Sequence, residues 1–317
     1  MKADEAFPLP ARRADTVPSV TRRTSRWRGV RHHWAGWLFV LPALVVYVAF
    51  VLLPLMLTVQ YSTLRWNGIG ESTFVGIDNY VRTVTDPDLI GVIANAFKLI
   101  IFFSGIPVLL GLLVASLIRR VATGALGTTS RTVLFLPQVI PLVAAGIMWT
   151  WLLSKNGLVN QVLNAIGLGG LTRTWLADFG LALPAVGVIG AWVLLGLCTI
   201  LLLTGMSKID QALYESARID GASAWQEFRS ITVPSLRYEI GVCITITVIA
   251  SLAAFDIIYI STLGGPGTTT TVPGLEIYRL AFYGRQVGLA SALAVVLVVL
   301  VLATVLPIQR LTREEPT

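Results

Sequence analysis

The chain has 317 residues, of which 55% are hydrophobic and only 13% are charged, and its formal net charge is +7. The charged fraction is roughly half of that in soluble domains, and the apolar residues fall into long blocks that are bounded by charges. This pattern excludes an ordinary soluble domain and indicates an integral membrane protein.

The N-terminal segment 1–33 is rich in Arg, Pro and Thr and lacks hydrophobic periodicity, which predicts a disordered basic tail. No charged residue lies between Trp34 and Leu64, a longer stretch than the roughly 20 residues that cross a bilayer. A cleavable signal peptide is the alternative, because basic residues precede the block. However, the apolar region is too long and no clean small-x-small site follows it. We therefore expect a first span at residues 34–61.

Five further apolar blocks follow, so we expect an all-α integral membrane fold with six transmembrane helices. The expected spans are residues 34–61, 92–118, 132–154, 181–206, 238–261 and 286–308. They form one domain over residues 34–309 and leave a short C-terminal tail at 310–317. Most of the 24 Lys and Arg lie in the tails and in the loops after spans two and four. The positive-inside rule then predicts a multi-pass plasma-membrane protein with both termini cytoplasmic, and it explains the net charge without nucleic-acid binding.

The loop after span three has a different character from the other loops. Its sequence "KNGLVNQVLNAIGLGG", at residues 155–170, carries apolar residues along one helical face. This spacing predicts a short amphipathic helix at the outer surface of the membrane.

The loop between spans four and five, residues 207–236, concentrates charge on the predicted cytoplasmic side. Ser207 or Asp210 supplies the chemistry of a helix start. Helical spacing then brings Glu215 within reach of Arg218.

The second half of this loop begins at a glycine. Gly221 allows a bend between two short helices, and Pro234 ends the segment before span five. Between them, Ala222, Trp225 and Phe228 form an apolar edge. An amphipathic helix outside the membrane favours a groove on a partner protein. The plainer alternative is a helix on the membrane surface with no partner.

The sequence offers little chemistry of its own. There is no phosphate-binding GxxxxGK[ST] segment, no HExxH, no GxSxG, and the two histidines are the adjacent pair His32 and His33. Cys198 and Cys243 lie far apart in apolar blocks without CxxC spacing. Only Asp256 is clearly embedded in a span, whereas a proton-driven carrier is expected to embed several ionisable groups. We therefore expect no catalytic site, no cofactor and no metal site.

The loop at residues 207–236 resembles the EAA loop of ABC-importer permease subunits. That motif reads E-A-A, three residues, G, nine residues, I-x-L-P. Here it is Glu215-Ser216-Ala217, then Gly221, then the segment "ITVP" at residues 231–234, with both spacings intact. The departures are Ser for the second Ala and Val for Leu.

Other segments resemble the carbohydrate branch of these permeases, the maltose and glycerol-phosphate type. They are "LPALVVYVAFVLLPL", "FVGIDNY", "FDIIYISTLGGPGTTTT" and "IYRLAFYGRQVGLASALAVV", so the resemblance runs from about Trp37 to Leu306. It implies a type I ABC-importer permease core with a cytoplasmic coupling helix. It also implies three partners besides the lipid bilayer: ATP-binding subunits that hold the ATP, a second permease chain, and an extracytoplasmic solute-binding protein.

The resemblance also implies a role for the loop, whose helix would dock in a cleft of the ATP-binding subunit and transmit its closure to the spans. The residues that match the motif or flank it are Glu215, Ala217, Arg218, Asp220, Gly221, Trp225, Phe228 and Pro234. In this interpretation Gly221 makes the turn and Glu215 and Arg218 orient the helix. Gly221→Asp is expected to abolish transport and to leave membrane insertion intact.

Sugar binding needs aromatic stacking and many hydrogen bonds, so polar and aromatic residues within the spans are candidates for the substrate path. These are Gln138, Trp149, Trp151, Trp192, Asp256 and Tyr259. The aromatic side chains are equally explained as interfacial anchors or packing residues. Asp256 is the stronger candidate, because an embedded carboxylate faces a cavity or a partner. Asn95 and Lys98 are expected either to pair with Asp256 or to point outward.

Two other functions remain open at this stage. A six-span secondary carrier or channel would need no ATP-binding partner. An importer of glycerol phosphate or another polyol would share the architecture, but a phosphate favours basic side chains along the path, and only Lys98 lies in or near a span.

Overall fold

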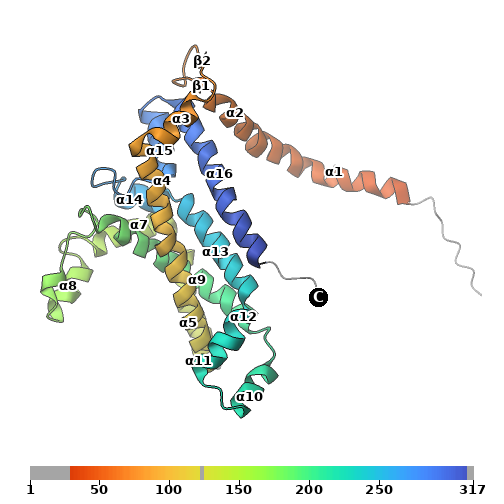
Figure 1. The fold of residues 1–317 in the computed structure, drawn as a ribbon, viewed down its shortest axis with the longest axis vertical. Helices are drawn as coiled ribbons and strands as arrows, with labels where there is room; N and C mark the ends of the chain where they lie inside the picture. Colours follow the sequence, from red (N-terminus) through yellow and green to blue (C-terminus); the bar gives the residue numbers. More distant parts are fainter. Residues whose placement is uncertain (1–28, 122–124, 313–317) are drawn as a thin grey trace, which may run out of the picture. The chain divides into compact units, whose positions relative to one another are not determined.

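A computed structural model describes residues 29–121 and 125–312 (Figure 1). The chain divides after Pro54 into two compact units, which are described separately. Most of the predicted N-terminal tail lies outside the described residues, and helix α1 (Gly29–Tyr47) begins before the expected boundary at residue 34. Of the predicted C-terminal tail, residues 313–317 also lie outside, and the last helix continues to Thr312.

The first unit is a single apolar helical rod. It consists of α1, a π-helical turn at Val48–Leu52 and the start of α2 (Leu53–Ser62). The stretch Trp37–Ser62 is apolar and long enough to cross a membrane, and none of its most apolar window is buried. Such a surface matches a helix that meets lipid or another protein.

The second unit is a helical bundle with one small hairpin. Strands β1 (Leu64–Arg65) and β2 (Thr73–Phe74) pair antiparallel, with Leu64 opposite Phe74. The helices of its first half are α3 (Asp78–Thr85), α4 (Pro87–Ile100), α5 (Ile106–Val121), α6 (Ala125–Val139), α7 (Leu142–Leu152) and α8 (Leu158–Ala165). Those of the second half are α9 (Ala182–Met206), α10 (Gln211–Ile219), α11 (Ala224–Glu227), α12 (Val233–Ser235), α13 (Arg237–Leu252), α14 (Asp256–Ser261), α15 (Pro273–Tyr278) and α16 (Val287–Thr312).

Four helical stretches are each long and apolar enough to cross a membrane: Trp37–Ser62, Pro87–Arg120, Ala182–Met206 and Val287–Thr312. Two further candidates are bent pairs, one at α6–α7 with an angle of 97° and one running from α11 to α13 with an angle of 70°. If each bent pair is one span, the described residues contain six candidate spans, which is the predicted number. The fifth candidate covers residues 224–252 and not the predicted 238–261, because the helix breaks between Leu252 and Asp256. The mostly helical architecture confirms the expected fold class.

Prolines explain where the long helices widen. Three of the four π-helical turns among the described residues, Val48–Leu52, Ile101–Gly105 and Phe228–Thr232, each end two residues before a proline; the fourth, Arg279–Tyr283, does not. Proline cannot donate to the carbonyl four residues earlier, and its ring crowds that carbonyl. In each case the residue before the proline donates its N–H to a carbonyl five residues back, so the helix continues through a wider turn.

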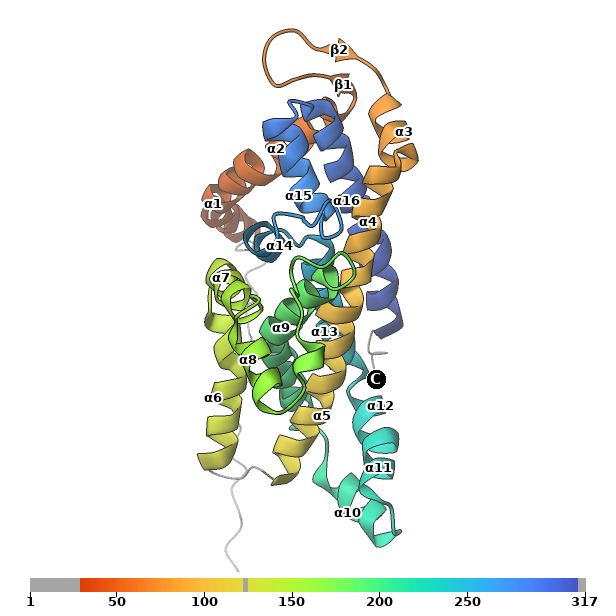
Figure 2. The ribbon, with the colours of Figure 1, turned by 90° about the vertical axis from the view of Figure 1, so that its left-hand side faces the viewer.

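Helix α9 lies at the centre of the second unit, packed along α5 on one side and α6 on another (Figure 2). Glycines permit these close approaches. A Cβ atom at Gly190 would overlap the Phe103 ring, and one at Gly196 would overlap the backbone of Leu134 in α6. Small polar residues add buried hydrogen bonds between helices, such as Thr247 Oγ1 to Ser104 Oγ at 2.7 Å.

The predicted amphipathic helix after span three is present as α8. Its Leu158 and Val162 are exposed, whereas Asn160 is buried. The Asn160 amide donates to three backbone carbonyls and its oxygen accepts from the Trp175 indole at 2.9 Å, which fixes the helix to the following loop.

The two ends of the second unit are built differently. Helices α10 and α11 lie at one end, and the hairpin, α3 and α15 lie at the other (Figures 1 and 2). The breaks at α6–α7 and α13–α14 fall between these ends (Figure 2). The predicted cytoplasmic loop and the predicted substrate path are therefore well separated.

Candidate functional site

The loop with the EAA-like pattern folds as two short helices joined by a tight bend. Asp210 caps the start of α10, its carboxylate accepting the Ala212 N–H at 2.9 Å. At the other end Gly221 has a φ of +80°, in the left-handed region. The Gly221 N–H bonds the Arg218 carbonyl at 3.1 Å and the Ala222 N–H bonds the Ala217 carbonyl at 2.9 Å. These two bonds form a Schellman motif, so the predicted bend at Gly221 is present.

The second helix, α11, begins with a reciprocal cap. Ser223 accepts the Gln226 N–H, and the Gln226 side chain accepts the Ser223 N–H at 2.7 Å. A π-helical turn then leads to Pro234 in α12, after which the chain turns into α13. The predicted stop at Pro234 thus takes the form of a wide turn and a bend.

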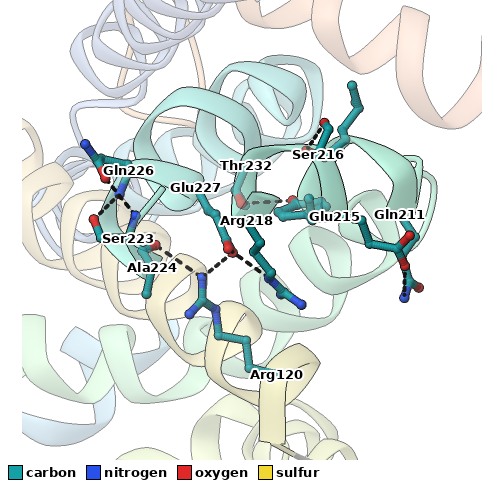
Figure 3. A network of polar contacts seen from close by, with 12 residues as sticks. Arg120, Gln211, Glu215, Ser216, Arg218, Ser223, Ala224, Gln226, Glu227 and Thr232 are labelled. Atoms are coloured by element: carbon teal, nitrogen blue, oxygen red, sulfur yellow. Dashed lines mark hydrogen bonds and ion pairs between the residues drawn. The ribbon is translucent and has the colours of Figure 1, made fainter. Parts of the chain in front are cut away.

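Glu227 is the centre of a polar network at the base of the loop (Figure 3). Only 4% of its side chain is exposed. Its Oε2 accepts from Arg120 Nη2 at 2.8 Å, and its Oε1 accepts from Arg218 Nε at 2.9 Å. The hydrogen bond from Arg218 to Glu227 raises the pKa of Arg218, so its guanidinium stays fully ionised.

A second contact joins the same elements. The Arg119 guanidinium lies 3.8 Å from the centroid of the Tyr214 ring, at cation–π distance. Tyr214 is buried in α10, and its hydroxyl lies 2.9 Å from Thr232 Oγ1. The end of α5 is therefore in contact with both halves of the loop.

The expected pairing of Glu215 with Arg218 is not formed. Arg218 bonds the buried Glu227, which is the stronger partner because little water competes with it. Glu215 accepts instead from Gln211 Nε2 at 3.2 Å and remains exposed (Figure 3).

The other predicted loop residues differ in how far their side chains are exposed to solvent. Trp225 stacks on Phe228 with ring centroids 5.4 Å apart, and the Trp225 ring is largely exposed. Ile219 is 86% exposed at the tip of α10. Ala217 accepts the capping bond described above, and Asp220 is the C-cap residue. Ile219 and Trp225 therefore give the loop exposed apolar side chains, and Glu227 is the buried charge at its base.

A groove of about 740 Å³ runs between the end of α5 and the loop. Its walls are apolar at Leu113 and Leu117, and its charged lining consists of Arg119, Arg120, Arg218 and Glu227. The groove separates part of the loop from the end of α5, while Phe228 packs against the apolar cluster that includes residues of α5 and α9.

A second candidate site lies where two spans are broken. Helix α6 ends at Val139 and α7 starts at Leu142, while α13 ends at Leu252 and α14 starts at Asp256. A hollow of about 530 Å³ opens at these breaks, and both Gln138 and Asp256 line it. Asp256 stands at the N-terminus of α14, where the helix dipole favours a carboxylate. Gln138 Oε1 is buried and has no hydrogen-bond partner among the described residues.

The remaining predicted path residues lie elsewhere. Trp149 packs edge-on against Trp192, with centroids 5.6 Å apart, and its indole N–H has no partner within the described part of the chain. Tyr259 stacks on Phe255 and meets Tyr278 beside a separate hollow. Trp151 is exposed. The structure thus brings Gln138 and Asp256 together at the hollow, and it pairs Trp149 with Trp192 outside the lining of that hollow.

Asn95 and Lys98 do not pair with Asp256. The Asn95 amide donates to the carbonyls of Thr268 and Thr271, which fastens the loop after α14 to α4. Lys98 is exposed, with its Nζ 3.5 Å from the Asn95 side-chain oxygen.

Sequence reasoning missed Glu227, Arg120 and Tyr214 as a group. Nothing in the residue order says that a carboxylate on a charged loop is buried, or that it pairs with arginines far along the chain. The only available signal was the S-x-x-Q pattern at Ser223, which predicts a helix start and so fixes the face on which Glu227 lies.

Comparisons with known proteins identify the family of the chain. Residues 107–311 match the family described as "Binding-protein-dependent transport system inner membrane component". The chain is 34% identical over 269 residues to the probable ABC transporter permease protein YurN of Bacillus subtilis, covering 84% of this chain and 92% of that protein. It is 32% identical over 270 residues to the trehalose/maltose transport system permease protein MalF of Thermococcus litoralis, covering 84% and 90% respectively.

A solved structure has the same fold. It is a crystal structure of a bacterial alginate ABC transporter in complex with an alginate pentasaccharide-bound periplasmic protein. The match has a TM-score of 0.77 at 26% identity and covers 91% of this chain and 97% of that one. The family match covers more than half of the chain, and the relatives align over most of their length. The chain therefore belongs to the family of binding-protein-dependent transport system inner membrane components, the permease subunits of ABC importers.

Proposed function

We propose that this chain forms half of the translocation pathway of an ATP-driven sugar importer and couples to an ATP-binding subunit through residues 207–236. The observation that carries the proposal is the loop itself. It is a capped pair of short helices with the exposed apolar residue Ile219 at the end of α10, and it is joined to α5 by the ion pair of Arg120 with the buried Glu227. A chain that has no phosphate-binding loop of its own needs a docking surface of this kind to couple its movement to ATP hydrolysis by a partner subunit.

The loop lies on the cytoplasmic side in this proposal, as the distribution of Lys and Arg predicts. ATP-driven closure of the ATP-binding subunits moves the docked loop, and the spans move with it to expose the pathway alternately to the two sides. Gly221, Trp225 and Phe228 shape the docked surface, and Glu215 and Asp220 lie on its exposed rim. A second permease chain completes the pathway, and a solute-binding protein delivers the cargo.

The hollow at the span breaks is the proposed sugar path. Gln138 has an unsatisfied acceptor there and Asp256 a carboxylate, and both accept hydrogen bonds from sugar hydroxyls. No Lys, Arg or His is among the described residues that line this hollow. A phosphorylated cargo would be repelled by Asp256 without a compensating cation, so the hollow favours an uncharged sugar over a glycerol phosphate.

The test is reconstitution in proteoliposomes with the ATP-binding subunit, the second permease and the binding protein. Labelled trehalose, maltose, diacetylchitobiose and glycerol 3-phosphate are supplied with ATP on the cytoplasmic side. Uptake of one of the sugars that requires both ATP and the binding protein supports the proposal. Uptake that persists without the ATP-binding subunit shows a secondary carrier or channel instead, and uptake of glycerol 3-phosphate alone refutes the sugar cargo.

A further inference from the structure

Glu227 is a buried charge whose two oxygens have separate partners. A carboxylate that is only 4% exposed is tolerated in a fold when it is paired and hydrogen-bonded. Arg120 bonds one oxygen at 2.8 Å and Arg218 bonds the other at 2.9 Å (Figure 3). Because each oxygen is occupied by a different guanidinium, the carboxylate cannot turn without losing one of them.

These three residues belong to three separate elements. Arg218 lies in α10, Glu227 in α11 and Arg120 in the last turn of α5. Arg120 Nη2 also bonds the carbonyl of Ala224, the first residue of α11, at 3.2 Å. The network is therefore a clasp that closes the bend of the loop on itself and also fastens it to α5.

The neighbouring contacts reinforce the same connection. Arg119 covers the ring of Tyr214 in α10, and the Tyr214 hydroxyl meets Thr232 just before α12. Both arginines come from the end of α5, so two consecutive side chains of one span hold both halves of the loop. Beside the groove, Phe228 of the loop also packs against the apolar cluster that includes Ile118 of α5.

These side-chain contacts connect the loop to α5, a helix that does not adjoin the loop along the chain. The loop continues covalently from α9 and into α13, whereas the side chains of Arg119 and Arg120 connect it to α5. Helix α5 in turn packs along α9, where Gly111 would place a Cβ 3.2 Å from the Cβ of Cys198. A displacement of α10 that is carried by the clasp therefore moves α5 and α9 together and does not merely bend the loop.

We propose that Glu227 is a positioning residue which joins the coupling loop to α5, so that the motion of a docked ATP-binding subunit reaches this span. The inference rests on the proposed function, because it assigns the route by which that function moves the bundle. The charge of Glu227 is then needed for coupling and not for folding or for docking of the partner.

The experiment compares Glu227→Gln, Arg120→Gln and the double variant in the reconstituted complex. Sugar uptake and ATP hydrolysis are measured on the same vesicles, with the sugar from the panel that the unaltered complex takes up best. Glu227→Gln is expected to lower the sugar moved per ATP by roughly tenfold while hydrolysis continues. Arg120→Gln lowers it similarly, and the double variant is no worse than either single one. Glu227→Asp, which keeps the charge on a shorter stem, gives an intermediate ratio.

Glu239→Gln is the matched control. Glu239 pairs with Lys208 at 3.2 Å and is also largely buried, but neither residue lies in α10 or α11. Its removal is expected to leave the ratio of uptake to hydrolysis unchanged. Copurification of the ATP-binding subunit with each variant is measured in parallel.

Each other outcome has a definite meaning. Unchanged uptake per ATP in Glu227→Gln overturns the clasp but leaves the proposed function standing. Loss of copurification in Glu227→Gln also overturns it, because Glu227 would then serve assembly. An equal loss of coupling in Glu239→Gln shows that any buried ion pair near the loop suffices and overturns the assignment to Glu227. Failure of the unaltered complex to take up any sugar in the presence of ATP refutes the proposed function and the inference together.

Discussion

Gly221 is the position where the coupling loop is most sensitive to backbone conformation. Its φ of +80° lies in the left-handed region, and a Cβ atom there would meet nothing within 4 Å. A Cβ atom therefore adds no clash within this chain, and Gly221→Ala acts through backbone strain alone. For an ordinary L-residue that strain is about 1–2 kcal/mol, and Asn, which adopts the left-handed region more readily, should experience less.

This magnitude gives a quantitative expectation for hydrogen exchange. A cost of 1–2 kcal/mol changes the ratio of closed to open loop by about 5- to 30-fold. In Gly221→Ala, the amides of α10 and of Ala222 should therefore exchange faster by that factor, since exchange follows local opening. Gly221→Asn should change exchange much less, and Gly221→Val more than Ala, because a β-branched residue is strained further. The measurement is exchange followed by mass spectrometry on the full chain in nanodiscs.

Transport by the same variants separates conformation from contact. If the ATP-binding subunit recognises the bend itself, the loss of uptake is smallest in Gly221→Asn, larger in Gly221→Ala and largest in Gly221→Val. The rate of hydrogen exchange rises in the same order. Gly91→Ala is the control, since Gly91 lies within α4 with open space around it and no positive φ. Equal exchange in the Ala and Asn variants refutes the strain argument. A different result would be an equal loss of uptake in Gly221→Asn, Gly221→Ala and Gly221→Asp, with the hydrogen exchange of Gly221→Asn unchanged. That result shows that any side chain at residue 221 collides with the docked partner.

Three further predictions concern the bundle. Gln138→Leu and Asp256→Asn should each lower sugar uptake with the complex still assembled, as copurification will show; uptake at the unaltered level in both would exclude the hollow as the path. Gly196→Ala should lower the unfolding temperature in detergent through overpacking of about 1–3 kcal/mol, because its Cβ would overlap the rigid Leu134 backbone; an unchanged melting curve would contradict this packing. Burial raises the pKa of Glu276, so ionisation is costly in the folded state and local stability at α15 should fall as pH rises through that raised pKa. Glu276→Gln should remove this dependence, which exchange of the α15 amides at pH 5 and pH 7 will test.

The sequence was sufficient for the architecture because apolar blocks and prolines act locally. Hydrophobic length located the long helices, and the spacing of Gly221 from Glu215 located the bend. The caps at Asp210 and Ser223 follow from residue type in the same way. These features depend on neighbours within one turn, which the residue order states directly.

The site could be predicted only in part, because its geometry depends on long-range contacts. Glu215 and Arg218 are helical neighbours, yet Arg218 bonds Glu227 once α11 folds back beside α10. Gln138 and Asp256 come from breaks in two different spans and meet only in the bundle. Trp149 was a reasonable candidate by residue type, but it lies partly buried in α7 and packs against Trp192 of α9. Residue type alone does not reveal which face of a uniformly apolar helix is inward.

The break between α6 and α7 also has a consequence for solvent. Between Val139 and Leu142 the chain stops making helical hydrogen bonds, and Pro141 has no N–H to offer. Carbonyl groups freed at membrane depth are tolerated only where they face protein or water. The hollow beside Gln138 is therefore expected to hold water when no cargo is present. If this hollow is the sugar path proposed above, an entering sugar replaces those waters with its own hydroxyls, and the exchange of hydrogen bonds brings little net gain. Weak net binding of this kind would let the proposed path empty in every transport cycle.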